Sequence, residues 1–239
     1  MVKKTSLLII ILFSLPLLGI IPFSNPIPVS GSAFLGLNPG TQAEYPPSLF
    51  EFASEITSNP SSSSFSGIYV ENLLADRIVQ QPIGNPGYVS DEEDTVTQFD
   101  MASQFSTIGI LAHNTHAGAA FFDLQTSDLI YLVTSTGEVQ AFRVVEKQKY
   151  QAINPTDPYS EFSDLNDPSS LVSAQTLFLR TYGRGGVLIL QTCIENSGDP
   201  SWGRLFVIAE PITIFSNSST RIMKMWDYLY RFSTNAQIK

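Results

Sequence analysis

Short apolar runs separated by turn-forming residues dominate the chain from Ile68 to Pro211. Runs of this length, rich in β-branched and aromatic residues, are typical of strands rather than helices. Ser135-Thr136-Gly137 separates two of them and predicts a hairpin. We predict strands over residues 68–74, 77–80, 87–90, 107–112, 129–134, 139–146, 176–182, 187–192 and 204–209. So many short strands with few helical segments favour a closed β-barrel or a sandwich.

Two segments depart from this strand pattern. Residues 34–67 are rich in Pro, Ser and Asn, and they predict a linker with a short helix around residues 48–56. The acidic, Pro-containing segment 154–170 interrupts the barrel plan, and long insertions of this kind are often binding loops. The predicted domain therefore spans residues 68–215.

Both ends of the chain have their own patterns. Lys3 and Lys4 precede an apolar run from Leu7 to Phe23, which predicts a signal peptide or a membrane anchor within residues 1–33. Small residues at 31–33 suit cleavage, so both fates stay open. Residues 216–239 have apolar positions near helical spacing and predict a C-terminal helix, capping the domain in preference to lying on a membrane.

Charge and cysteine content narrow the function classes. Of 13 Lys and Arg, two lie in residues 1–33, so the rest of the chain carries 11 basic against 22 acidic residues. Such an acidic surface repels phosphate backbones and argues against a nucleic-acid partner. Cys193 is the one cysteine, so no internal disulfide can form in what we expect to be an exported protein. It is either a small buried apolar residue or a nucleophile.

Three groups suited to thiol chemistry stand at the ends of predicted strands. Cys193 ends the strand 187–192, His113 ends the strand 107–112, and Arg204 begins the strand 204–209. A thiol nucleophile needs a base or cation to stabilise its thiolate, and a donor for the charge on the attacked carbonyl oxygen. His116 is the alternative imidazole, but His113 is favoured because it directly follows a strand. One cysteine and two histidines are too few for a metal site, so we expect none.

These residues resemble the motifs of the sortase family. Leu190-Gln191-Thr192-Cys193 is similar to the family's Thr-Leu-x-Thr-Cys strand end, with Ile189 in place of the first Thr. Leu111-Ala112-His113-Asn114 resembles its Gly-His element, and Arg204 opens the next strand as the family's Arg does. The segments 118–124 and 128–130 resemble its Phe-x-x-Leu and Gly-Asp stretch, closest to class B sortases.

The resemblance implies a mainly β fold, a closed eight-stranded barrel with short helices. It implies a cysteine transpeptidase with Cys193 as nucleophile, His113 as acid/base and Arg204 as the cation at the reacting carbonyl. Asn114, Thr192 and Trp202 are expected to contact substrate, although Trp202 equally suits a packing role. No cofactor is implied. The implied partners are a protein with a C-terminal sorting signal and an amine of the cell envelope, met at the outer face of the membrane.

Two other classes remain as alternatives. A papain-type cysteine protease would use the same groups, but in that class the Cys precedes the His, whereas His113 here precedes Cys193. A catalytically silent barrel that serves as an adhesion or scaffold module is the stronger alternative, because a fold does not guarantee an active site.

Overall fold

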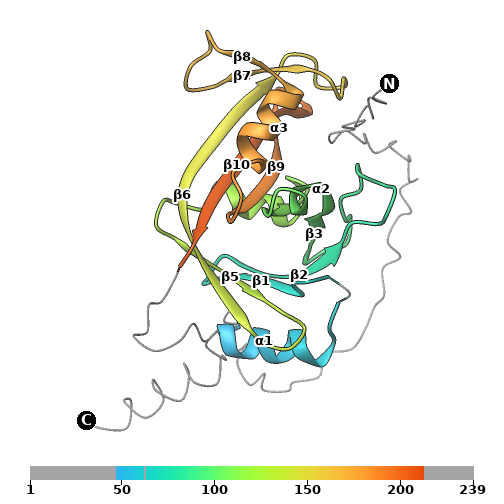
Figure 1. Ribbon diagram of the computed structural model, residues 1–239, viewed down its shortest axis with the longest axis vertical. Helices are drawn as coiled ribbons and strands as arrows, with labels where there is room; N and C mark the ends of the chain where they lie inside the picture. The colour runs from blue at the N-terminus through green and yellow to red at the C-terminus, as the bar shows by residue number, and fades with distance from the viewer. Residues whose placement is uncertain (1–46, 62, 213–239) are drawn as a thin grey trace, which may run out of the picture.

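The computed structural model describes residues 47–61 and 63–212 (Figure 1). The predicted targeting segment, 1–33, and the predicted C-terminal helix, 216–239, lie outside these residues. Within the described part, no helix is long and apolar enough to cross a membrane.

The described residues form strands, three α-helices and one 3-10 helix. The helices are α1 (Leu49–Ser58), α2 (Asp100–Ser103), the 3-10 helix η1 (Ala117–Phe122) and α3 (Ala174–Tyr182). The strands are β1 (Gly67–Val70), β2 (Leu74–Gln80), β3 (Thr95–Phe99), β4 (Ile108–Leu111), β5 (Leu129–Val133), β6 (Val139–Ala152), β7 (Glu161–Asp164), β8 (Leu171–Ser173), β9 (Leu188–Asn196) and β10 (Asp199–Pro211).

Eight of these strands close into a barrel. Their order is β10-β9-β4-β3-β2-β1-β5-β6, and β6 pairs with β10 to complete the circle. The β2–β3 and β4–β9 pairs are parallel, and the other neighbours are antiparallel. β7 and β8 extend the sheet beyond β6 as a flap. The predicted closed, mainly β barrel is therefore confirmed, and closure leaves no free edge in the barrel itself.

Alternation along the strands fills the barrel with aliphatic side chains. Ile68, Ile110, Leu132 and Leu190 are buried in one cluster that includes residues from all eight barrel strands. Successive strand residues point to opposite faces, so every second position contributes to this core. Asp76 is a carboxylate on the inward-facing row of β2, between Leu74 and Ile78.

The predicted strand over residues 176–182 is wrong, because these residues belong to α3. The Ser173 side chain accepts a hydrogen bond from Thr176 N and caps the helix. Leu177, Phe178 and Tyr182 recur at helical spacing and are buried against the outer face of the barrel. The helix cap and the helical spacing of the buried residues therefore outweigh the high β-propensity of Thr, Phe and Tyr in this segment.

The predicted short helix near residue 48 is confirmed as α1, which packs on the barrel. Ser48 and Glu51 form a reciprocal capping box at its start. Phe52 and Ile56 are buried against β1, where a side chain on Gly67 would lie within 2.9 Å of both. Residues 49–58 are thus part of the packed unit, although their polar surroundings predicted a linker.

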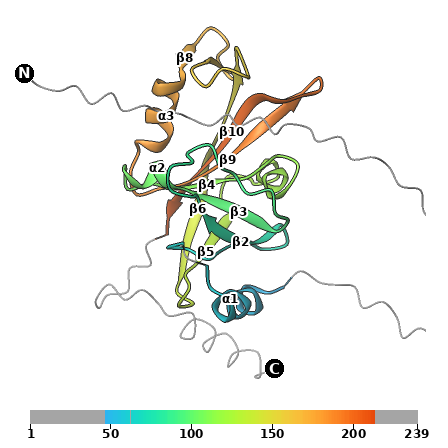
Figure 2. The same ribbon diagram turned by 90° about the vertical axis from the view of Figure 1, so that its right-hand side faces the viewer.

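Two further strand predictions differ from the structure. The predicted strand 68–74 is broken by a turn in which Asn72 has a φ of 57°, so β1 and β2 form a hairpin. The described residues 87–90 contain no strand, and the strand in this region is β3, after the acidic turn. The segment 154–170 contains the short strand β7 and leads into β8, while its other residues form turns and loops. This flap and α1 lie at opposite ends of the molecule (Figures 1 and 2).

Candidate active site

Cys193 and Arg204 are directly opposite each other on neighbouring strands. β9 and β10 are antiparallel, and their register pairs Arg204 with Cys193. Side chains opposite each other on such strands lie on the same face, with Cβ atoms about 4.5–5.5 Å apart. The fold therefore brings the predicted nucleophile and the predicted cation together.

His113 follows the strand on the other side of β9. β4 and β9 are parallel, and Leu111 pairs with Gln191. One residue further, Ala112 N donates to Gln191 O at 3.2 Å. Extending this register by two residues along both strands aligns His113 with Cys193. His113 thus lies two residues beyond the last paired residue of β4, on the side of β9 away from Arg204.

A tight turn connects the strands that carry Cys193 and Arg204. Asn196 pairs with Asp199, and the two residues between them, Ser197 and Gly198, have φ angles of 54° and 85°. Two positive φ angles are the signature of a type I′ hairpin turn. Trp202 is half-buried on β10 within the irregular pairing between Asp199 and Gly203.

The Arg204 side chain is held in place by hydrogen bonds to backbone carbonyls of its own strand. Its side chain is 2% exposed, and Nη1 donates to Ser201 O at 2.9 Å and to Gly203 O at 2.6 Å. Burial lowers the pKa of the guanidinium, while Cys193 and Asp199 act in the opposite sense. An arginine remains charged even so, because its ordinary pKa lies far above neutral pH. The site therefore has a fixed cation beside a half-buried free thiol.

A close approach of η1 shapes the turn that contains His113. His113 O accepts hydrogen bonds from His116 N and Gly118 N, each at 3.0 Å. A Cβ on Gly118 would overlap Thr192 Oγ1 and would lie 2.6 Å from His113 O. Glycine is therefore required here, and it locks the His113 turn against β9.

Asp91 is the site residue that the sequence analysis missed. Its Oδ1 lies 3.1 Å from His113 Nε2, and this ion pair joins the acidic turn before β3 to the end of β4. The acidic turn alone carried no sign of this contact. The pairing of β3 with β4, which matches Thr97 with Leu111, is what brings the two segments together, and a strand partner cannot be read from one sequence.

The remaining predicted residues surround this site. Asn114 Nδ2 donates to Pro200 O at 3.5 Å and so links the His113 turn to the β9–β10 hairpin. Thr192 is 2% exposed, and its Oγ1 has no hydrogen-bond partner among the described residues. His116 Nδ1 lies 3.0 Å from Thr115 Oγ1, and its ring is 6.1 Å from that of His113. The described residues include no group of three or more potential His, Cys, Asp or Glu metal ligands.

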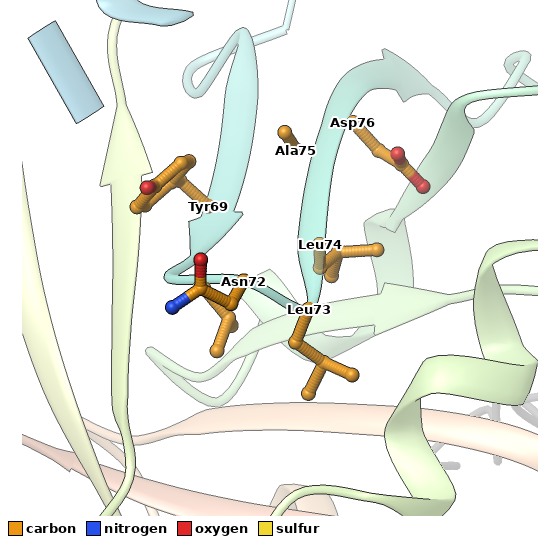
Figure 3. Close-up of a pocket in the computed structure, with 7 residues that line it drawn as sticks. Tyr69, Asn72, Leu73, Leu74, Ala75 and Asp76 are labelled. Atoms are coloured by element: carbon orange, nitrogen blue, oxygen red, sulfur yellow. The ribbon is translucent and has the colours of Figure 1, made fainter. Parts of the chain in front are cut away.

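A separate hollow of about 170 Å³ lies at the β1–β2 hairpin (Figure 3). It is lined by Tyr69, Val70, Asn72, Leu73, Leu74, Ala75 and Asp76, and not by the three predicted catalytic residues. Asp76 is 7% exposed, and burial together with the nearby Asp94 raises its pKa to about 6. The charged form of the Asp76 carboxyl therefore destabilises the folded state at neutral pH.

No protein-family model and no curated protein matches the sequence. Solved structures with a similar fold are sortases. Sortase A of Listeria monocytogenes is 12% identical, with a TM-score of 0.38 over 63% of this chain and 89% of that one. The pilus-related sortase C of Group B Streptococcus is 14% identical, with a TM-score of 0.38 over 64% and 69%. Sortase E1 of Streptomyces coelicolor, solved with a tripeptide in its active site, is 14% identical, with a TM-score of 0.40 over 63% and 89%.

At these identities the chemistry has to be argued from the residues of this chain. The half-buried thiol lies opposite a buried guanidinium, a group that can donate hydrogen bonds to the oxygen of an attacked carbonyl. An imidazole on the adjacent strand can exchange protons with the thiol or with a bound amine. This set of groups suits acyl transfer through a thioester.

Proposed function

We propose that this chain is a sortase-type cysteine transpeptidase. The observation that carries the proposal is the pairing of Cys193 with Arg204 on β9 and β10, with His113 two residues beyond the end of β4 on the other side of β9. It is supported by the half-burial of the free thiol and the burial of the guanidinium opposite it. The same residue types spread over unrelated elements would carry no such inference.

In the first half-reaction, the Cys193 thiolate attacks a backbone carbonyl of the substrate. The Arg204 guanidinium stabilises the negative charge that develops on the carbonyl oxygen. His113 then gives a proton to the departing amine, and the C–N bond breaks as the thioester remains. The atoms and charges balance without any cofactor.

In the second half-reaction, an acceptor amine loses its proton to His113 and attacks the thioester. A new amide bond forms, the C–S bond breaks, and the thiolate is regenerated beside Arg204. Water in place of the amine would give hydrolysis. The acceptor that we propose is an amine of the cell envelope or of a pilin.

The substrate that we propose is a protein with a C-terminal sorting signal, bound as an extended chain. The flap is one wall of its groove, because β7 pairs with β6 next to β10, at the level of Arg204. Tyr159 and Leu171 are exposed on this flap and can contact apolar positions of a peptide. Asn114 and Trp202 are proposed as contacts on the other side of the thiol, whereas Thr192, expected to contact substrate, is 2% exposed and packs against Gly118.

The proposed setting is the outer face of a cell membrane. Residues 1–33 would direct export and either anchor the protein or be removed. An exported transpeptidase would meet both an emerging substrate and an envelope amine at that surface.

Product analysis tests the proposed function. The purified protein is incubated with a library of extended peptides and with a small amine, and the products are identified by mass spectrometry. We expect peptides cut at one internal bond, with the amine joined to the new carboxyl end. Cys193→Ala should give neither cleavage nor transfer. Intact peptides with the wild-type protein would favour the silent scaffold module.

A further inference from the structure

The turn before β3 brings one carboxylate to the proposed catalytic histidine. Asp91 Oδ1 lies 3.1 Å from His113 Nε2, although the Asp91 side chain itself is 83% exposed and the His113 side chain only 27%. An exposed ion pair contributes little to stability, with a typical value of about 0–1 kcal/mol. A role in fold stability therefore does not account for the contact.

The backbone on both sides of Asp91 is firmly anchored. Ser90 is buried, its N donates to Thr97 Oγ1 at 2.8 Å, and its Oγ accepts from Thr95 Oγ1 at 2.8 Å. Glu92 N donates to Ser90 Oγ at 3.2 Å, and Glu92 O accepts from Thr95 Oγ1 at 2.7 Å. Asp91 thus projects from a turn fixed to β3 at several points. A carboxylate on such a turn can hold an imidazole in one orientation.

We propose that Asp91 is a positioning residue that selects which nitrogen of His113 works on the thiol. In the neutral imidazole, a hydrogen bond from Nε2–H to the Asp91 carboxylate keeps the proton on Nε2 and leaves the lone pair of Nδ1 for Cys193. This inference rests on the proposed function, because it assigns a role within the same site. It adds Asp91, from the turn that precedes β3, to the three proposed catalytic residues, which lie on or next to β4, β9 and β10.

The proton inventory is consistent with this role. The thiol proton of Cys193 moves to Nδ1, which gives a thiolate and an imidazolium that still donates from Nε2 to Asp91. The Nδ1 proton later passes to the leaving amine, and the imidazole returns to its neutral Nε2–H form. Asp91 accepts a hydrogen bond throughout and never takes up the proton.

Other charged groups lie near this pair. Glu92, Glu93 and Asp94 share the turn, His116 stands one turn beyond His113, and Arg204 lies across β9. His113 forms no ion pair with any of these groups, whereas its contact with Asp91 is direct. Removal of a neighbouring acidic side chain is therefore a matched control for the loss of negative charge.

The test compares three variants of the full chain. Asp91→Ala removes the partner of Nε2, Asp91→Glu keeps a carboxylate, and Glu92→Ala removes one negative charge from the next position. We expect Asp91→Ala to lower kcat for thioester formation on the order of tenfold to a hundredfold with KM little changed, because only the reacting geometry is lost. Asp91→Glu should recover part of the rate, and Glu92→Ala should match the wild type.

A second readout is independent of turnover. The chain has two histidines, so ¹⁵N NMR of the imidazoles can be assigned with a His116→Gln variant. At a pH where His113 is neutral, its proton should sit on Nε2 in the wild type and redistribute toward Nδ1 in Asp91→Ala. Equal effects of Asp91→Ala and Glu92→Ala on rate and tautomer would overturn the inference. A wild-type protein that forms no thioester would overturn the proposed function as well.

Discussion

Arg204 is unusual at the residue scale because a charged side chain is almost entirely buried at the proposed site. Its Nη1 donates hydrogen bonds to Ser201 O and Gly203 O, and these bonds hold the guanidinium in place. A planar fork can satisfy these carbonyls and still present donors to a substrate, whereas an ammonium is a single point of charge. The role of Arg204 therefore depends on its shape as well as on its charge.

Arg204→Lys tests this dependence. We expect roughly a hundredfold loss of acyl transfer, as for removal of one donor from an oxyanion site, together with a lower melting temperature. Arg180→Lys, at an exposed position in the last turn of α3, is the matched control and should leave both unchanged. Wild-type transfer by a folded Arg204→Lys protein would show that Arg204 does not act on the substrate.

Asp76 gives a prediction that concerns stability rather than catalysis. Its pKa in the folded protein, about 6, lies above the ordinary carboxyl value of 3.8. The folded state therefore binds the proton more tightly, and stability from this group is present below pH 4 and is lost as the pH rises through 6. The difference between these pKa values corresponds to at most about 3 kcal/mol, and solvent screening of the carboxyl reduces the loss at neutral pH to about 2 kcal/mol.

Asp76→Asn should relieve this loss, because asparagine carries no charge at any pH. We expect the variant to be more stable than the wild type by about 1–2 kcal/mol at pH 7.5 and nearly equal to it at pH 4. Denaturant unfolding at both pH values measures the difference, and Asp100→Asn at an exposed position is the control. An equal effect of Asp76→Asn at the two pH values would contradict the assigned cause.

At the scale of elements, the sequence predicts secondary structure most accurately where the local pattern of apolar residues agrees with the observed strand pairing. The predicted strands before His113 and Cys193 and the predicted hairpin 129–146 correspond to observed strands, although Cys193 and Arg204 lie within β9 and β10 and not at their ends. The sequence of α3 predicts a strand because its residues have high β-propensity, although the Ser173 cap and the helical spacing of its apolar residues favour a helix. Asp91 was missed because its partner is set by the pairing of β3 with β4, which no local signal encodes.

At the start of η1, the absence of a Cβ atom on Gly118 allows the close packing of the His113 turn. Gly118→Ala would force Cβ onto Thr192 Oγ1 and His113 O, so the His113 turn must move. We expect a loss of about 1–3 kcal/mol in the free energy of unfolding and slower labelling of Cys193 by a vinyl sulfone. Ala119→Ser adds one atom at the exposed neighbouring position and should change neither. Wild-type stability and labelling in Gly118→Ala would show that this packing does not support the site.

At the scale of the whole molecule, one register level runs from the flap to the strands that carry Arg204 and Cys193. Asp164 pairs with Tyr150, Tyr150 with Arg204, and Arg204 with Cys193. The flap is thereby attached to the side of the proposed site, while α1 and the turn between β5 and β6 lie at the far end (Figure 1). Substrate choice and chemistry can therefore be separated in the structure.

Exchange of residues 154–170 for the matching segment of a sortase with a different signal tests this separation. We expect the peptide preference to change while vinyl sulfone labelling of Cys193 persists, because the catalytic strands are untouched. Replacement of the turn 135–137, at the other end of the barrel, should leave the preference as it was. The same preference in a folded, labelled chimera would place recognition elsewhere.

The most direct test of the central claim is the covalent state of Cys193 during turnover. Intact-protein mass spectrometry of the wild type, quenched in acid after mixing with a cleavable peptide, should show an added mass equal to the acyl part of the peptide. The adduct should map to Cys193, disappear on addition of an amine acceptor and be absent from Cys193→Ala, whose fold should be retained because the half-buried thiol contributes little core volume. Peptide cleavage without an adduct on Cys193, or with equal turnover by Cys193→Ala, would contradict the account.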